Sequence, residues 1–179
     1  FSLPNANNVV FATSGAGKSY AIKLEVLRTM MMGTDVIIID PEYEYKELAE
    51  AVGGTYINVS LASEAKINPF DLPRPVGQES KTEDIIRSGV ITVKGLVRIM
   101  LGQLSAEEDS IIDMALLETY AKKDITPDSD LSQIEPPTMR DLQYILEGME
   151  GGENIALRLK KYTEGTFSGL FTSPTNVQM

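Results

Sequence analysis

Two hydrophobic spacings alternate along the first sixty residues. Short apolar runs at 9–11, 36–39 and 55–59 are bounded by polar residues, glycine or proline, which predicts buried parallel strands. Between them, apolar residues recur at helical spacing over 19–32 and 44–52, and each of these stretches is followed by glycine. The order strand, helix, strand, helix, strand predicts an α/β fold with a doubly wound parallel sheet.

The pattern changes after Pro73. Residues 73–79 contain prolines and a glycine and are interpreted as a linker. Beyond it, apolar residues repeat at helical spacing over 85–101 and 139–149, which predicts amphipathic helices that pack on one another. Three hydroxyl residues are each followed three positions later by an acid, the spacing of a helix start, in the pairs Ser80 and Glu83, Ser105 and Glu108, and Thr138 and Asp141.

The amino-acid composition limits which side chains could take part in catalysis or binding. The chain has 179 residues, no cysteine and no histidine, so catalysis must depend on carboxylates, lysine, hydroxyls and a metal ion. The net charge of −10 argues against direct nucleic-acid binding by this segment. A small basic cluster of Arg158, Lys160 and Lys161 is interpreted as a solvated helix face, with a nucleic-acid or subunit contact as the alternative. No apolar stretch is long enough for a membrane span, so we expect a cytoplasmic protein.

The strongest motif is a phosphate-binding loop. Residues 12–19 read Ala-Thr-Ser-Gly-Ala-Gly-Lys-Ser and match the Walker A pattern, except that Ala12 replaces its first glycine. We expect Lys18 to place its charge on the β- and γ-phosphates and Ser19 to offer its hydroxyl to Mg²⁺. Because no Asn-Lys-x-Asp element reads guanine, ATP is the predicted nucleotide. The predicted binding residues are Thr13, Ser14, Gly15, Ala16, Gly17, Lys18, Ser19 and Tyr20.

Two acids after the second apolar run are further candidates. Asp40 ends a hydrophobic run as a Walker B aspartate does, and Glu42 could polarise the attacking water. Asp40 could hold Mg²⁺ through water, act with Glu42 near the γ-phosphate, or only cap the following helix; the pattern leaves these readings open. The predicted catalytic residues are therefore Lys18, Asp40 and Glu42.

Several segments together resemble the conjugative-transfer ATPases of type IV secretion systems, the TraC/TrbE kind, within the HerA–FtsK superfamily. The similar stretches are the P-loop region 5–19, the run with its acidic tail at 36–45, Ile-Asn-Pro-Phe-Asp-Leu at 67–72, and the segments 104–109 and 159–171. The P-loop alone is generic. Asp-Pro-Glu followed by Asn-Pro-Phe in this order is more specific.

This resemblance implies a RecA-like P-loop NTPase core, a parallel sheet with helices on both faces, into which an all-helical subdomain is inserted. We expect residues 1–73 to form the first part of the core, 74–165 the helical insert, and 166–179 a return toward the core. The family's Walker B strand and arginine finger are expected beyond Met179, in a longer protein. The chain alone is therefore expected not to hydrolyse ATP appreciably.

The resemblance also implies partners. These are ATP with Mg²⁺, other copies of the chain (often in a hexamer), and secretion-channel subunits at the inner face of the cell membrane, with a possible DNA contact. A DNA-pumping translocase of the same superfamily is the first alternative. A small-molecule kinase that uses Asp40 to orient an acceptor hydroxyl and a non-catalytic nucleotide-binding module are the others.

Overall fold

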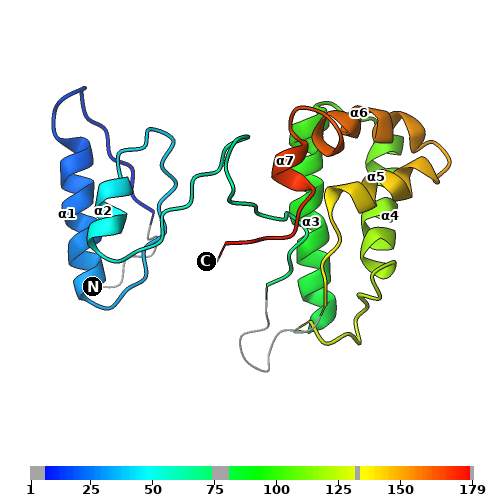
Figure 1. Ribbon diagram of the computed structural model, residues 1–179, viewed down its shortest axis with the longest axis horizontal. Helices are drawn as coiled ribbons and strands as arrows, with labels where there is room; N and C mark the ends of the chain where they lie inside the picture. Colours follow the sequence, from blue (N-terminus) through cyan, green and yellow to red (C-terminus); the bar gives the residue numbers. More distant parts are fainter. Residues whose placement is uncertain (1–6, 74–80, 132–133, 178–179) are drawn as a thin grey trace. The chain divides into compact units, whose positions relative to one another are not determined.

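A computed structural model describes residues 7–73, 81–131 and 134–177. The chain divides into a first unit, residues 1–56, and a second unit, residues 57–179. The described residues form seven helices, labelled in Figure 1: α1 Lys18–Met31, α2 Lys46–Ala51, α3 Thr82–Leu101, α4 Ala106–Ala121, α5 Met139–Glu147, α6 Glu153–Thr163 and α7 Ser168–Phe171.

The predicted parallel sheet is wrong for the described residues, which contain helices and no strand. The apolar runs at 9–11, 36–39 and 55–59 form no backbone hydrogen bonds with one another in the described part of the chain. A strand exists only when its N–H and C=O groups pair with a neighbour. Phe11, Ile37 and Ile39 are instead 90 to 93% exposed. The described residues therefore do not form the sheet of the RecA-like core that the resemblance implies.

The helix predictions are confirmed. The stretches predicted at 19–32 and 44–52 correspond to α1 and α2, and the later periodic runs correspond to α3 and α5. Helices depend on hydrogen bonds between residues four apart, so a short stretch of sequence is enough to predict where a helix forms. The residues of the predicted linker after Pro73 lie outside the described residues, and the domain boundaries at 73 and 165 stay predictions.

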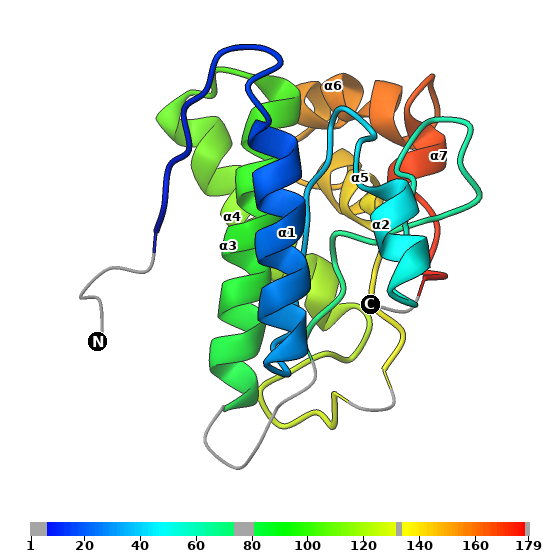
Figure 2. The same ribbon diagram turned by 90° about the vertical axis from the view of Figure 1, so that its left-hand side faces the viewer.

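The second unit contains the hydrophobic core. Helix α4 packs against α3 and α5, while α6 packs against α3, α5 and α7 (Figures 1 and 2). Fully buried side chains come from each of α3, α4, α5 and α6, among them Val93, Leu116, Leu146 and Ile155. The periodic apolar stripes of the sequence meet in this core.

Capping residues fix where the core helices begin. The Ser105 hydroxyl accepts a hydrogen bond from the Glu108 N–H at 3.1 Å, and the Glu108 carboxylate accepts one from the Ser105 N–H at 2.8 Å. This reciprocal pair is the predicted helix start, and it is confirmed. At α5, the Asp141 carboxylate accepts from both the N–H and the hydroxyl of Thr138. Ser80, the first predicted cap, lies outside the described residues.

The Asn-Pro-Phe segment, residues 68–70, packs against this core and forms hydrogen bonds with neighbouring segments. The buried side-chain amide of Asn68 donates to the Pro137 carbonyl at 2.8 Å, and its oxygen accepts from the Phe70 N–H at 3.2 Å. Phe70 is fully buried, with its ring 5.7 Å from that of Tyr120. The Thr175 hydroxyl accepts from the Asn68 N–H at 2.7 Å. These contacts give the segment a structural role.

Candidate nucleotide-binding site

The Walker A residues form a turn that leads directly into α1. Gly15 and Gly17 have φ values of 77° and 86°, in the left-handed region that side chains disfavour. The Ala16 N–H donates to the Thr13 carbonyl at 3.1 Å and closes the turn. A side chain at either glycine would meet open space, so the backbone angle is what requires glycine here. The sequence therefore specifies the shape of this loop locally.

The N-terminus of α1 is open to a ligand. Gly17 precedes the helix and offers no side-chain cap, and no acidic residue lies in the first turn. The first N–H groups of a helix have no intrahelical partner, and the helix dipole places partial positive charge beside them. Lys18, the first residue of α1, adds a full positive charge and is exposed. This loop and helix end have the chemistry of an anion-binding site.

Ser19 and Tyr20 complete the predicted set. Ser19 is half-buried in the first turn of α1, while Tyr20 is 68% exposed. All eight predicted binding residues, 13–20, therefore lie on one continuous loop-helix segment. Oxygen ligands suit Mg²⁺, which usually combines one or two protein ligands with phosphate oxygens and water. The described residues contain no group of three or more acids that could hold a metal ion by themselves.

Asp40 makes the contacts of a turn-capping residue. Its carboxylate accepts hydrogen bonds from the N–H of Tyr45 at 2.9 Å and of Glu42 at 3.3 Å. Partial burial raises the pKa of this carboxyl, but backbone N–H donors at residues 42–45 lower it more, so the net pKa lies below its ordinary range. The turn ends at α2 and contains Tyr43 with a left-handed φ of 60°.

Glu42 is exposed, on the same turn. Among the described residues, no hydrogen bond or ion pair joins Asp40 or Glu42 to residues 12–19. One contact that the sequence did not predict does link this turn to α1: the Lys23 ammonium lies 5.3 Å from the centre of the Tyr45 ring. The sequence does not predict this contact, because Lys23 and Tyr45 are far apart in the chain and only the fold brings them together.

The basic cluster on α6 is largely engaged. The Arg158 guanidinium donates to the Glu108 carboxylate at 2.8 Å and to the Leu101 carbonyl at 2.6 Å, at the C-terminus of α3. The Lys161 ammonium lies 4.9 Å from the centre of the Tyr162 ring. Arg158 therefore joins three helices, and its charge is directed inward. No helix in the described ranges is long and apolar enough to cross a membrane.

Comparison with known proteins places the chain in a family. The sequence model of the TraG P-loop domain matches residues 2–125. The structure of VirB4 of Thermoanaerobacter pseudethanolicus is similar, with a TM-score of 0.79 and 32% sequence identity over 93% of this chain. The chain spans 45% of that protein's length. No curated protein matches the sequence.

These matches confirm the resemblance stated from the sequence. The family match includes the whole Walker A segment and both acids of the Asp40 turn, and it extends through α3 and α4. The similarity to VirB4 covers nearly all of the chain. The chain belongs to the TraG P-loop domain family, and so to the P-loop ATPases that include VirB4.

Proposed function

We propose that residues 13–20 bind ATP together with Mg²⁺. The observation that carries the proposal is the uncapped N-terminus of α1, which directly follows two glycines in left-handed conformations and begins with Lys18. Backbone N–H groups and the helix dipole would receive the phosphates, and Lys18 would neutralise their β and γ charges. The Ser19 hydroxyl would serve as one ligand of the magnesium ion.

Lys18, Asp40 and Glu42 are the residues that we propose for catalysis. The two oxygens of Asp40 already accept backbone hydrogen bonds, which supports a role in holding the turn at residues 40–45. Glu42 is exposed on this turn, and we propose that its carboxylate positions the attacking water. Asp40 would then be a positioning residue that acts through the turn.

Replacing Lys18 with alanine tests the binding site. The loss of a charged donor to phosphate should weaken ATP binding by about ten- to hundredfold. Arg28→Ala is the matched control, because it removes one positive charge from the last turn of the same helix. Titration with a fluorescent ATP analogue in the presence of Mg²⁺ would measure both. Equal affinity in Lys18→Ala and the unsubstituted chain would exclude the site, and a marked preference for GTP in competition would exclude the choice of ATP.

We further propose that this chain belongs to an ATPase motor of a type IV secretion or conjugative DNA-transfer system. The TraG domain match and the similarity to VirB4 support this proposal. Assembly into hexamers, contact with channel subunits, contact with DNA, and a cytoplasmic location at the inner face of the membrane belong to the same proposal. DNA-stimulated turnover that falls steeply with salt would instead favour the DNA-pumping translocase.

The chain of 179 residues should not hydrolyse ATP appreciably by itself. Its sequence supplies the phosphate loop, but no second apolar run that ends in paired acids and no obvious arginine finger. Such an arginine contributes a factor of about a thousand or more to turnover. A phosphate-release assay on this chain beside a longer version would test the proposal. Comparable turnover in the two would show that Asp40 and Glu42 complete the catalytic site.

A further inference from the structure

Helix α4 has a buried apolar side and also carries apolar side chains on its opposite, exposed side. One side, which includes Ile112, Leu116 and Tyr120, is buried in the core of the second unit. On the other side, Met114 and Leu117 are 54% and 55% exposed. A helix of a water-soluble domain normally turns charged residues outward, and a helix that is apolar all round is usually covered on all sides. Met114 and Leu117 therefore form a small apolar patch among the polar residues of this side.

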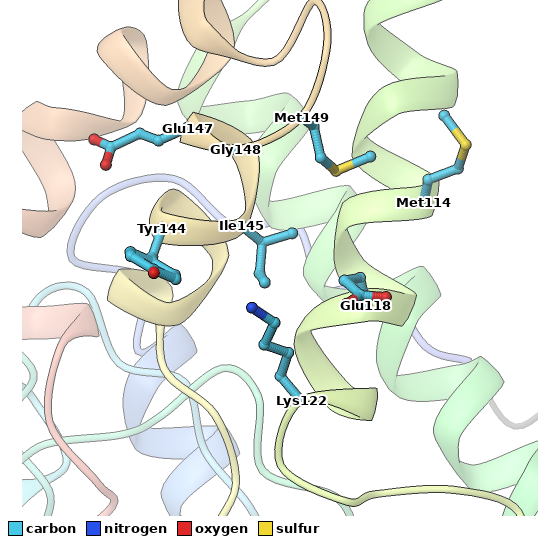
Figure 3. Close-up of a pocket in the computed structure, with 8 residues that line it drawn as sticks. All are labelled: Met114, Glu118, Lys122, Tyr144, Ile145, Glu147, Gly148 and Met149. Carbon is cyan, nitrogen blue, oxygen red and sulfur yellow. The ribbon is translucent and has the colours of Figure 1, made fainter.

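A groove lies beside this exposed side. It has a volume of about 600 Å³ and runs between α4 and the end of α5. Figure 3 shows Met149 extending toward Met114 across the groove, with Ile145 between the two helices. Tyr144 is 69% exposed at its rim. Methionine and tyrosine side chains adapt to a partner surface, and they are enriched at protein interfaces.

The charges on the exposed side of α4 are complementary to those of a second, antiparallel copy of the same helix. Its residues recur at helical spacing: Met114, Leu117, Glu118, Ala121 and Lys122. Among the described residues, neither Glu118 nor Lys122 forms an ion pair; the Lys122 ammonium lies 5.5 Å from the centre of the Tyr144 ring. One acid and one base four positions apart suit an antiparallel copy of the same helix.

We propose that this side of α4 is a contact between two copies of the chain, whose α4 helices pack antiparallel about a two-fold axis. An axis beside residues 119 and 120 overlaps the last turns of the two α4 helices and sets Leu117 of one copy near Ala121 of the other, large against small. It also brings Glu118 of each copy toward Lys122 of the other. The contact does not use the phosphate-binding loop, so it is independent of the proposed ATP site.

The exposed acid and base on α3 differ from those on α4 because they are already paired within the chain. The outer face of α3 exposes Ile91 and Ile99 at 65% and 82%, but its acid and base four positions apart, Glu83 and Arg87, already pair with one another at 2.9 Å. A second copy joined through α3 would have to exchange this existing ion pair, whereas neither Glu118 nor Lys122 has an ion-pair partner among the described residues.

Charge exchange tests the contact. Glu118→Lys and Lys122→Glu each place like charges opposite one another twice across the two-fold axis, and each should weaken self-association by about tenfold. The double variant E118K/K122E restores both pairs and should associate like the unsubstituted chain. An equimolar mixture of the two single variants should also associate, because the mixed pair has opposite charges at both contacts. Sedimentation equilibrium would measure these dissociation constants.

A cross-linking readout separates this contact from other self-association, including any through the exposed apolar runs of the first unit. The chain has no cysteine, so Ala121→Cys with a short bis-maleimide reports only on neighbours of position 121. Glu83→Lys is the matched control, because it reverses the charge of an exposed acid that pairs with a base four residues on, in α3. Circular dichroism would confirm that each variant is folded.

The outcomes are distinct. Weakened cross-linking in both single variants, recovery in the double variant and in the mixture, and no effect of Glu83→Lys would support the antiparallel contact. A monomeric unsubstituted chain, association that both single variants leave unchanged, or a mixture that does not recover would overturn it. Because ATP binding is measured separately, failure of this contact would leave the proposed nucleotide site unaffected.

Discussion

The two units of the chain differ in what stabilises their helices. In the first unit no described residue is buried, and α1 and α2 are stabilised by local hydrogen bonds and a few surface contacts. In the second unit α3, α4, α5 and α6 share a continuous core of buried apolar residues. The residues predicted to bind ATP all lie in the first unit, while the second unit has the packing of a stable domain. Structural stability and predicted chemistry are therefore concentrated in different parts of the sequence.

This difference matters because helices shorter than about 12 to 15 residues are marginal in water unless packing supports them. Helix α1 has 14 residues and α2 has six, and neither contains a buried side chain. The shape of the phosphate-binding loop depends on its glycines and on the start of α1. The loop therefore keeps this shape only while α1 is folded. The first unit should therefore be the part that responds most to a ligand or to a covering surface.

Amide hydrogen exchange should show the largest contrast. Amides in the middle of α4 and α5 should exchange only when the core opens, whereas those of α1 should exchange through local opening, at least about a thousandfold faster. Mass spectrometry of the intact chain would measure both, and ATP with Mg²⁺ should slow exchange in the first turn of α1. Equal protection in the two units without ligand would contradict the comparison and indicate that a further contact covers α1.

Matched isoleucine substitutions should give the next largest effect. Ile155 is fully buried in α6, and Ile37 is 93% exposed in the first unit. Ile155→Ala should lower the free energy of unfolding by about 2 to 5 kcal/mol, while Ile37→Ala should stay within about 0.5 kcal/mol. Urea unfolding of the whole chain, monitored by circular dichroism, would measure both. A similar loss in the two variants would show that the exposed run at 36–39 is covered in solution.

The same contrast explains what the sequence could predict. The stripes of α3 and α5 and the pair Ser105 and Glu108 act over three or four residues, so the pattern alone was sufficient. A strand at 36–39 needs a second segment beside it, and an apolar run does not say whether that segment is present. The predicted sheet was wrong for this reason.

The candidate site was partly predictable in the same way. Walker A spacing describes one continuous segment, so residues 13–20 could be named together before the fold was known. Asp40 could not be assigned from its pattern, because capping and metal binding both place an acid after an apolar run. The hydrogen bonds to Glu42 and Tyr45 depend on how the turn folds. The inward direction of Arg158 depends on three helices meeting, and no local pattern predicts it.

Loss of the α4 cap should have a smaller effect. Ser105→Ala removes the acceptor of the Glu108 N–H and should cost about 1 kcal/mol of the free energy of unfolding. Ser110→Ala is the matched control: its hydroxyl donates only to the Ala106 carbonyl within the same helix, so its loss should be close to neutral. Urea midpoints of the two variants would be compared. A larger loss in Ser110→Ala would show that the cap does not define this helix start.

The pH response of Asp40 should be the smallest effect, and it is confined to the first unit. Because the folded pKa of this carboxyl lies below its ordinary value of about 3.9, the unfolded chain takes up the proton at a higher pH than the folded chain. Ionised Asp40 therefore stabilises the turn above the ordinary pKa, and this contribution is lost as pH falls through the folded value. The Tyr45 amide, which donates to this carboxylate at 2.9 Å, should report the change as a chemical-shift titration. Its midpoint should lie below about 3.9, and the titration should disappear in Asp40→Asn. If Asp40 instead binds Mg²⁺ directly, adding ATP with Mg²⁺ should lower the midpoint further and displace the Tyr45 resonance. An unchanged resonance on saturation with ATP and Mg²⁺ would support the positioning role, in which the carboxylate holds the turn and Glu42 alone faces the water.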